Sequence, residues 1–315
     1  MSILVRTISD LFRGSRLNNQ SPAASITDQK THLTEQFRIS AESGDIATAA
    51  KLLDQLASIG TNSEELEHLE KHVEFLKHVD IVSARLPGPR YLDWLEWFHT
   101  KLNPKTYIEI GVDTGKSLKF AQSSTRSIGI DPDFNVVFPI GSWAKLYRLP
   151  SDVFFANQNP LEIFDSQEID FGFIDGLHTF DQALKDFINI EQYSSANSIV
   201  LLHDIFPVIP ATTKRNRDTI LWVGDTWKVV LALREYRPDL NFFTIPTYPS
   251  GLGVIANMNR ASTVLRDQYH EIVERLMPLE LEDLPEGLEP LLNLTQNDFS
   301  SVLQKLSYRT KATAT

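Results

Sequence analysis

Hydrophobic positions follow two different periods along this chain. Beyond residue 105, short runs of β-branched and aromatic residues alternate with segments whose apolar positions recur every three or four residues. Such alternation predicts a mostly parallel sheet with helices on both faces. No helical pattern separates the last two runs, so they predict a terminal β-hairpin. The runs expected to be strands are Thr106–Ile110, Ser127–Ile130, Val153–Ala156, Phe171–Ile174, Ser198–Leu202, Asn241–Ile245 and Gly253–Ile255.

The region before these runs has helical periodicity. Apolar positions between Ile46 and Ala57 recur at helical spacing. Asp45 is placed to cap the first turn of this helix, and Gly60 is placed to end it. An earlier helix is expected over Asp28–Ser43. Residues 41–50 resemble part of one tetratricopeptide-type repeat, and a single copy favours a structural or oligomerising role.

A second helix of this hairpin is predicted from its start signal. Thr61 and Glu64 match a capping box, in which the threonine hydroxyl and the glutamate side chain satisfy each other's backbone N–H groups. Apolar positions then continue at helical spacing to Val79. The helical ends of the chain are therefore the regions where we expect a homo-oligomer contact or a protein partner.

Small polar residues and prolines mark the expected boundaries. Residues 17–25 are small and polar, and residues 87–89 read Pro-Gly-Pro. We expect a flexible tail over residues 1–24, a helical domain over 25–90, an α/β domain over 91–260 and a C-terminal helical extension over 261–315. The tail also has a weak amphipathic pattern that fits a membrane-surface or docking helix, formed by Ile3, Leu4, Ile8, Leu11 and Phe12.

Composition narrows the class of protein. The 315 residues are 42% hydrophobic, which allows a sizeable core. The net charge of -11 argues against a general nucleic-acid binder, because phosphate contacts need clustered Lys and Arg. The chain has no cysteine, so disulfides and thiolate metal sites are excluded, and a reducing cytoplasm is the expected location. No apolar run reaches the roughly 20 residues of a membrane helix, so no integral membrane segment is expected.

The strongest motif follows the first predicted strand. Residues 107–117 read Tyr-Ile-Glu-Ile-Gly-Val-Asp-Thr-Gly-Lys-Ser, an apolar strand that ends in a glycine-containing turn expected to open a helix. Glycines let the backbone approach a ligand, and a helix N-terminus presents free N–H groups. Asp131 ends the next predicted strand, where a carboxylate can accept hydrogen bonds from both hydroxyl groups of a ribose.

Three ligand-binding patterns compete for this loop. A dehydrogenase-type dinucleotide loop requires glycines where the chain has Asp113 and Lys116, and a Walker-type phosphate loop requires one at Ile110. The pattern E-x-G-x-x-x-G-x-S fits at every position, and it resembles the S-adenosylmethionine motif of the catechol-type O-methyltransferases. Glycines that serve packing alone are the remaining alternative, and the spacing to Asp131 argues against it.

That resemblance implies a cofactor and residues to bind it. Gly111 and Gly115 would border the methionine moiety of S-adenosylmethionine, Ser117 would meet its carboxylate and Asp131 would hold the ribose. Glu109 would support the amino end of the cofactor. Five β/α units followed by a β-hairpin also match the plan of class I methyltransferases. The fold class implied is an α/β, Rossmann-like, seven-stranded and mostly parallel sheet.

Titratable residues follow the fourth and fifth predicted strands. Asp175 and His178 come after one strand, and His203 and Asp204 come after the other. Carboxyl ends of adjacent strands border the crevice where open α/β sheets bind ligands, so these four side chains should converge beside the cofactor. Methyl transfer to a hydroxyl group requires that the acceptor be held in line and lose its proton. A divalent metal held by carboxylates assists both requirements.

The four residues resemble the set found in metal-dependent O-methyltransferases that act on sugars and catechols. The resemblance implies that Asp175, His203 and Asp204 hold a divalent cation such as magnesium or manganese. It implies that His178, beside Asp175, is the catalytic base, a role that suits a group titrating near neutral pH. His203 departs from the family's two oxygen ligands, so it favours manganese, iron or zinc, or stays outside the coordination shell. Either histidine could instead serve in hydrogen bonding or helix capping.

Further motifs extend the resemblance to bacterial methyltransferase-like domains associated with glycans and natural products. They are Ser151–Ala156, Ile174–Phe180, Gly224–Lys228 and Tyr248–Val254, and the resemblance covers about residues 91–257. It implies an S-adenosylmethionine-dependent O-methyltransferase that acts on a sugar or another hydroxylated small molecule. A non-catalytic Rossmann-like scaffold with helical docking ends, or another nucleotide enzyme on the same sheet, are the alternatives.

A basic segment follows the expected metal residues. Lys214, Arg215 and Arg217 lie between Asp204 and Gly224, where the resemblance implies a lid over the acceptor. Three cations in an acidic chain would favour a carboxylated or phosphorylated acceptor. An ordinary solvated loop is the alternative.

Overall fold

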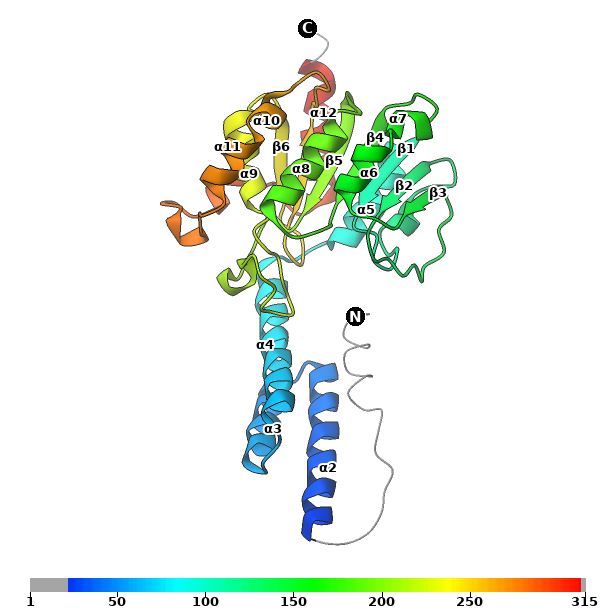
Figure 1. The fold of residues 1–315 in the computed structure, drawn as a ribbon. Helices are drawn as coiled ribbons and strands as arrows, with labels where there is room; N and C mark the ends of the chain where they lie inside the picture. The colour runs from blue at the N-terminus through cyan, green and yellow to red at the C-terminus, as the bar shows by residue number, and fades with distance from the viewer. Residues whose placement is uncertain (1–21, 313–315) are drawn as a thin grey trace. The chain divides into compact units, whose positions relative to one another are not determined.

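A computed structural model describes the backbone of residues 22–312 and the side chains of residues 26–306. The chain divides into two compact units (Figure 1). One comprises the residues up to Asp80 together with Thr219–Leu221, and the other comprises Ile81–Asp218 and the residues from Trp222 onward. The amphipathic pattern expected over residues 3–12 lies outside the described residues.

The first unit is helical, as its periodicity predicts. Its helices are α2 (Pro22–Ser43), α3 (Ile46–Ser58) and α4 (Ser63–Arg85), the last of which continues into the second unit. The carboxylate of Asp45 accepts a hydrogen bond from the backbone N–H of Thr48, so it caps α3 as expected. Residues 22–25, expected in a linker, belong to α2. The core of this unit contains Leu33, Phe37, Ala49, Leu52, Leu56, Leu69 and Val73.

The predicted capping box at Thr61 is wrong by one residue. Helix α4 begins at Ser63, and the side chain of Asn62 accepts a hydrogen bond of 2.8 Å from the backbone N–H of Glu65. The sequence contains the same spacing twice in adjacent registers, Thr61 with Glu64 and Asn62 with Glu65. Thr61 is buried, and the helix is capped instead by Asn62, the next residue with a short polar side chain.

The second unit contains the predicted seven-stranded sheet. Its strand order is β3-β2-β1-β4-β5-β7-β6. Pairings from β3 through β5 are parallel, and β7 is antiparallel to both of its neighbours. The expected terminal hairpin is therefore confirmed. The strands are β1 (Thr106–Ile110), β2 (Arg126–Ile130), β3 (Trp143–Tyr147), β4 (Ile169–Ile174), β5 (Ser194–His203), β6 (Asn241–Ile245) and β7 (Leu252–Ala256).

One predicted strand is a helix. Residues Val153–Ala156 lie in α6 (Ser151–Asn157), and the third strand is formed by Trp143–Tyr147. Phe154 is buried whereas Val153 is exposed, so this apolar run is one side of a short amphipathic helix. Strand β3 forms one edge of the sheet and is only partly buried, which explains its weak hydrophobic signal.

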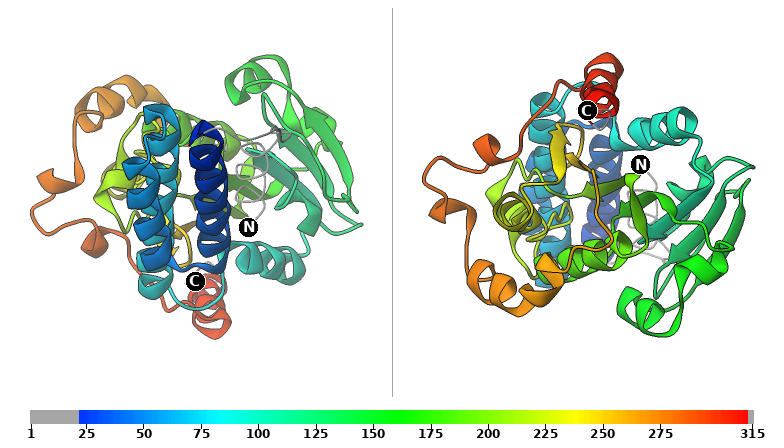
Figure 2. Two further views of the ribbon diagram at one scale, coloured as in Figure 1. Left: turned by 90° about the horizontal axis from the view of Figure 1, so that it is seen from below. Right: turned by 90° about the horizontal axis from the view of Figure 1, so that it is seen from above.

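Helices cover both faces of this sheet (Figure 2). Helices α5 and α12 pack on the face that carries the aromatic core, and α8 packs against β4 and β5 on the other face, with α6, α9, α10 and α11 beside it. The helices of this unit are α5 (Tyr91–Leu102), α6, α7 (Pro160–Ile163), α8 (Phe180–Glu191), α9 (Lys228–Tyr236), α10 (Val264–Asp267), α11 (Tyr269–Leu276) and α12 (Phe299–Ala312). Short 3₁₀ turns occur at Leu118–Phe120, Pro210–Thr213, Leu281–Asp283 and Glu289–Leu291.

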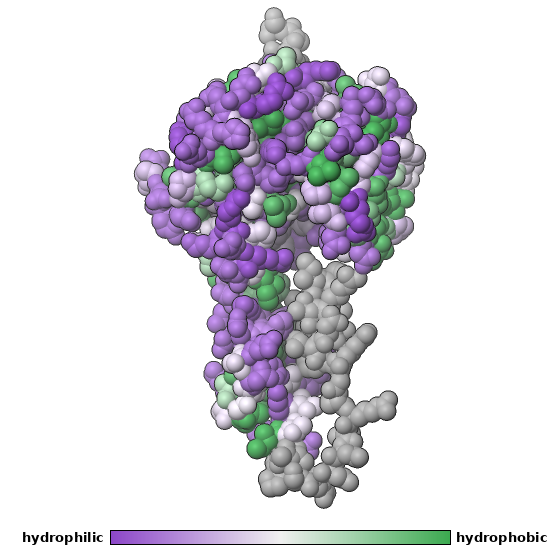
Figure 3. All heavy atoms as spheres, viewed as in Figure 1, coloured by the Kyte–Doolittle hydropathy of each residue, from purple (hydrophilic) through white to green (hydrophobic). Residues whose placement is uncertain are grey.

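Aromatic side chains dominate the core of the second unit. Trp94 and Phe98 from α5 are fully buried against Tyr107, Phe171 and Phe173 of the sheet. Each such burial contributes about 1.5–3 kcal/mol relative to exposure. On the side that carries α8, hydrophilic side chains dominate the surface of this unit, and apolar ones form small separate patches (Figure 3). Among the described residues, none of the helices combines the length and apolar character needed to cross a membrane.

Candidate active site

The glycine loop after β1 packs directly against the loop after β4. Gly111 has a φ of +94°, and a Cβ atom at this position would lie 2.0 Å from the carbonyl oxygen of Asp175. The backbone N–H of Asp175 in turn donates to the carbonyl oxygen of Ile110 at 2.9 Å. A side chain at residue 111 would therefore separate the predicted cofactor loop from the predicted catalytic loop.

Asp131 holds the same glycine loop from the end of β2. One carboxylate oxygen accepts a hydrogen bond from the backbone N–H of Asp113 at 2.8 Å, and the other accepts one from Asp133 at 2.7 Å. A carboxylate oxygen has two lone pairs, so each oxygen can still accept a further hydrogen bond from a ligand hydroxyl group. The structure thus brings Gly111 and Asp131, predicted from separate motifs, to one edge of the sheet.

Glu109 is buried beneath this loop. Its carboxyl group accepts hydrogen bonds of 2.6 Å from the hydroxyl groups of both Ser117 and Tyr107. Burial raises the pKa of Glu109 to about 8, against the opposing effect of these two hydrogen bonds. The Ser117 hydroxyl, expected to meet the cofactor carboxylate, therefore donates to Glu109 in the described structure.

The helix expected after Gly115 is a single 3₁₀ turn. The chain forms this turn at Leu118–Phe120 and then passes through polar residues into β2. Gly115 has a φ of +77° and packs against Val136. Polar residues at 122–125 give this segment no apolar face to bury, which explains why the helix does not continue.

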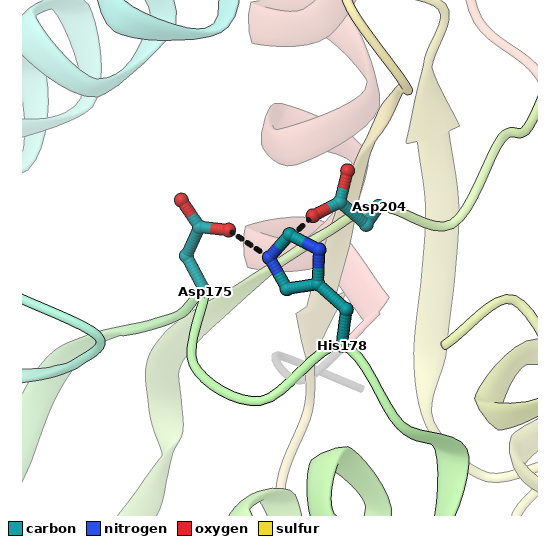
Figure 4. Close-up of side chains that lie close together, drawn as sticks. All are labelled: Asp175, His178 and Asp204. Atoms are coloured by element: carbon teal, nitrogen blue, oxygen red, sulfur yellow. Dashed lines mark ion pairs between the residues drawn. The ribbon is translucent and has the colours of Figure 1, made fainter. Parts of the chain in front are cut away.

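The four residues predicted to carry the chemistry do converge. His178 Nε2 lies 3.0 Å from an oxygen of Asp204 and 3.5 Å from an oxygen of Asp175. Figure 4 shows the imidazole between the two carboxylates, which come from the ends of β4 and β5. His203 Nδ1 contacts the same two carboxylates, at 3.1 Å from Asp175 and 3.2 Å from Asp204.

The pKa values in this cluster are determined mainly by the attraction between the histidines and the two carboxylates. Burial alone would lower the pKa of each imidazole, but the charges of Asp204 and Asp175 outweigh it. The pKa of His178 rises to about 9 and that of His203 rises to about 10. Burial would raise the pKa of Asp175, but its two histidine neighbours hold it well below its usual range. Both imidazoles are therefore positively charged at neutral pH in the protein alone.

The donor set fits a divalent cation. One ligand atom from each of Asp175, His178 and Asp204 lies within 4.8 Å of the others, a group with the composition of a metal site. One oxygen of Asp204 is buried without a well-oriented hydrogen bond among the described residues. This geometric group contains His178 in place of His203, whose Nδ1 instead bridges the two carboxylates.

Tyr91 is a site residue that the sequence motifs did not indicate. Its ring lies 4.4 Å from the ring of His203, and the ammonium group of Lys116 lies 5.8 Å from its centroid. Burial, followed by the charges of Asp175 and Asp204, raises the pKa of its hydroxyl, so Tyr91 stays neutral. Tyr91 is the first residue of α5, a helix whose apolar residues pack in the core, and no motif marks it as a site residue.

The basic segment before Gly224 is largely engaged with the protein's own acids. Arg215 pairs with Asp181 at 2.8 Å and with Asp225 at 3.4 Å. Lys214 lies 3.5 Å from a carboxylate oxygen of Glu280. These ion pairs weaken the expectation that the segment selects an acidic acceptor.

A known protein family matches the part of the chain that contains this site. Residues 108–205, which contain the glycine loop and all four clustered residues, match a family model described as a methyltransferase domain. No curated protein matches the sequence. The matched segment spans β1 to the end of β5, the part of the sheet that carries the candidate site.

Solved structures with low sequence identity also align with the chain. One is an SAH-bound methyltransferase from Podospora anserina, with 16% identity and a TM-score of 0.41, covering 63% of this chain and 97% of that one. Another is an O-methyltransferase from Streptomyces achromogenes in complex with SAM and involved in tomaymycin synthesis, with 11% identity and a TM-score of 0.39, covering 58% and 88%. A third is an SAH complex of an O-methyltransferase from Bacillus cereus, with 12% identity and a TM-score of 0.37, covering 57% and 89%. The second unit thus has the Rossmann-like sheet of the class I methyltransferase fold, and residues 108–205 within it match the methyltransferase domain model.

Proposed function

We propose that this protein is an S-adenosylmethionine-dependent O-methyltransferase that acts on a hydroxyl group of a sugar or another hydroxylated small molecule. One observation carries the proposal: Asp175, His178, His203 and Asp204 converge beside the loop that contains Gly111. The match of residues 108–205 to a methyltransferase domain supports the same activity. The activity would reside in the α/β domain that we propose over residues 91–260.

Binding of the cofactor would use the glycine loop and the end of β2. We infer that Asp131 accepts the ribose hydroxyl hydrogens, because the backbone N–H groups of Asp113 in the glycine loop and of Asp133 after β2 fix its two oxygens. Gly111 and Gly115 adopt positive φ angles, which lets this loop pack closely on the Asp175 backbone and on Val136 while keeping the shape needed to border the cofactor. Glu109 and Ser117, joined by a hydrogen bond, would hold the loop in shape beneath the methionine end. S-adenosylmethionine supplies the methyl group.

His178 is the proposed base. Its Nε2 atom faces the two carboxylates, and its side chain is 25% exposed, against 6% for that of His203. An acceptor hydroxyl can therefore reach His178 more readily than His203. Asp175 and Asp204 would orient the acceptor oxygen and hold His178 in place. Positive charge introduced beside these carboxylates would lower the pKa of His178 and prepare it to take a proton.

We propose that a divalent cation binds through Asp175 and Asp204, with His203 as the third ligand or as a support for the two carboxylates, which leaves His178 free to act as the base. When bound, such a cation orients acceptor oxygens and lowers their pKa. The hydrogen bond of His203 Nδ1 with Asp175 and its ion pair with Asp204 favour a supporting role for that imidazole.

Calorimetric titration with S-adenosylmethionine and with its demethylated product tests the assignment. Binding of both, with no binding of ATP, is the expected result, since Ile110 occupies the glycine position that a Walker loop requires. A panel of hydroxylated sugars and sugar nucleotides then tests turnover, before and after chelation and re-addition of magnesium or manganese. ATP binding without a signal for the methyl donor would overturn the proposal, and full activity after exhaustive chelation would remove the metal from it.

A further inference from the structure

The loop that carries His178 is held by a segment 44 residues away in the sequence. Trp222 places its backbone carbonyl oxygen 3.1 Å from His178 Nδ1. Its indole ring also stacks on the imidazole, with ring centroids 5.1 Å apart and planes inclined by 20°. One residue therefore contacts both an edge and a face of the proposed base.

The next residues lock the same loop through its backbone. Gly224 has a φ of +66°, and a Cβ atom there would lie 1.8 Å from the carbonyl oxygen of His178. Asp225 is buried and accepts a hydrogen bond of 2.7 Å from the backbone N–H of Phe180, the first residue of α8. The segment Trp222–Asp225 thus contacts the loop at His178 and at the first residue of α8.

This segment is itself well anchored within the second unit. The backbone N–H groups of Val223 and Gly224 donate to the carbonyl oxygen of Thr212 at 3.0 and 3.1 Å. The indole N–H of Trp222 donates to the carbonyl oxygen of Lys214 at 2.6 Å. Lys228 and Arg215 each lie 3.4 Å from the buried carboxylate of Asp225. Backbone hydrogen bonds, an indole hydrogen bond and two ion pairs therefore hold this segment in place beside His178.

We propose that Trp222–Asp225 is the positioning segment of the base, a role that rests on the proposed O-methyltransferase function. A carbonyl oxygen can only accept, so the contact with Trp222 requires a proton on Nδ1 of His178. The nitrogen that exchanges a proton is then Nε2, the atom that faces Asp175 and Asp204. The stacked indole fixes the plane of the ring. Trp222, Gly224 and Asp225 act through His178, so they are positioning residues.

Gly224→Ala tests the backbone contact, with Gly287→Ala as its matched control. Both glycines have a similar positive φ, +66° and +71°, but nothing lies within 4 Å of a Cβ atom at Gly287. Both substitutions impose similar backbone strain, and only the first displaces the loop of His178. Trp222→Leu removes the stacked ring, Trp222→Phe keeps an aromatic face there, and Trp143→Leu is its control on the exposed edge strand β3.

The first readout is the NMR spectrum of ¹⁵N-histidine-labelled protein, with His178 signals identified by their loss in His178→Gln. In the wild type we expect a protonated Nδ1 and ring protons shifted by the indole of Trp222. Gly224→Ala should change both the Nδ1 and the ring-proton signals of His178, because it displaces the loop. Trp222→Leu keeps the backbone carbonyl and should remove only the indole-induced shift of the ring protons, and Trp222→Phe should restore part of that shift. Both control variants should leave the His178 signals unchanged. Unchanged His178 signals in Gly224→Ala and in Trp222→Leu would overturn the proposal.

The second readout separates catalysis from cofactor binding, with an acceptor from the panel described above. Displacing a catalytic group by about 1 Å can cost roughly 10²-fold in rate. We expect kcat to fall by about that factor in Gly224→Ala, while the Kd of S-adenosylmethionine and the kcat of Gly287→Ala remain at wild-type values. An equal loss in both glycine variants would overturn the positioning role. Failure of the wild type to bind S-adenosylmethionine would remove the proposed function and leave the NMR result on His178 intact.

Discussion

At the scale of single residues, two histidines in one cluster differ in what surrounds them. His203 is almost wholly buried, with Nδ1 between Asp175 and Asp204. His178 is more exposed and has the carbonyl oxygen of Trp222 at its second nitrogen. This difference in exposure and partners is the reason why we propose His178, and not His203, as the base.

His178→Gln should reduce turnover by about 10²–10⁴-fold, the usual contribution of a positioned base. Glutamine keeps the size and polarity of the side chain but cannot take up a proton at neutral pH. The Kd of S-adenosylmethionine should stay within about twofold, since the predicted cofactor residues lie at the end of β1, in the loop that follows it and just after β2. Steady-state kinetics and calorimetry measure the two quantities. Full activity of this variant would show that His178 is structural.

Asp131→Asn should weaken binding of S-adenosylmethionine by at least tenfold. A hydrogen bond to a charged group is worth about 1.5–3 kcal/mol, and an amide retains only one accepting oxygen. The matched control is Asp133→Asn, because the Asp133 side chain is 99% exposed and pairs with Arg148 at 3.3 Å, away from the carboxylate of Asp131. Equal affinities for both variants, measured by calorimetry, would exclude Asp131 from the ribose site.

At the scale of secondary structure, termini and edges were the places where sequence patterns misled. Val153–Ala156 is apolar enough for a strand, but Phe154 alone is buried and the segment forms α6. Trp143–Tyr147 forms β3 although it is only half buried. A run of four residues does not distinguish one face of a short helix from a strand, and an edge strand needs little apolar surface.

Asn62→Ala should destabilise the helical unit by about 0.5–2 kcal/mol, the usual cost of losing an N-cap. The loss follows from the hydrogen bond that Asn62 accepts from the backbone N–H of Glu65. Chemical unfolding followed by far-ultraviolet circular dichroism measures it. Asn62→Asp, which keeps a capping oxygen, is the control and should stay near the wild-type stability. A loss in Asn62→Asp as large as in Asn62→Ala would contradict the assigned cap.

At the scale of the whole molecule, buried ionisable groups couple stability to pH. His99 is fully buried between the rings of Tyr107 and Phe171, and burial lowers its pKa to about 3. The unfolded chain binds a proton at His99 near pH 6.5, whereas the folded chain does not. Above pH 6.5 His99 is neutral in both the folded and the unfolded chain, so it does not reduce the free energy of unfolding. As the pH falls from 6.5 toward 3, only the unfolded chain gains the proton, and the free energy of unfolding decreases.

His99→Phe should make the second unit less sensitive to acid. At pH 5 the wild type should have lost about 2 kcal/mol relative to pH 7 through this histidine alone, from about 1.4 kcal/mol per pKa unit. Unfolding free energies of wild type and variant, compared at pH 7 and pH 5, isolate this contribution from other groups. Asp186, whose pKa burial raises to about 6, acts with the opposite sign in both proteins and cancels in the comparison. Parallel pH profiles would refute the assignment to His99.

Much of the domain was predictable because its signals are local. A strand such as Thr106–Ile110, the glycines at 111 and 115 and the spacing to Asp131 are all encoded by neighbouring residues. The convergence of Asp175 and Asp204 was predictable because the carboxyl ends of adjacent parallel strands meet at one edge of a sheet. Hydrophobic periodicity and topology rules thus determine the sheet and the neighbourhood of the site.

Tertiary structure alone decided which side chains complete that neighbourhood. Tyr91 reaches the ring of His203 from a helix that precedes the sheet, and Trp222 reaches His178 across 44 residues of sequence. Neither contact has a local signature, because an aromatic residue in an apolar stripe looks the same whether it fills a core or borders a site. The burial of Thr61, which is also a tertiary effect, explains why Asn62 and not Thr61 caps α4. Local patterns determine what each segment becomes, whereas packing between distant segments determines which atoms meet.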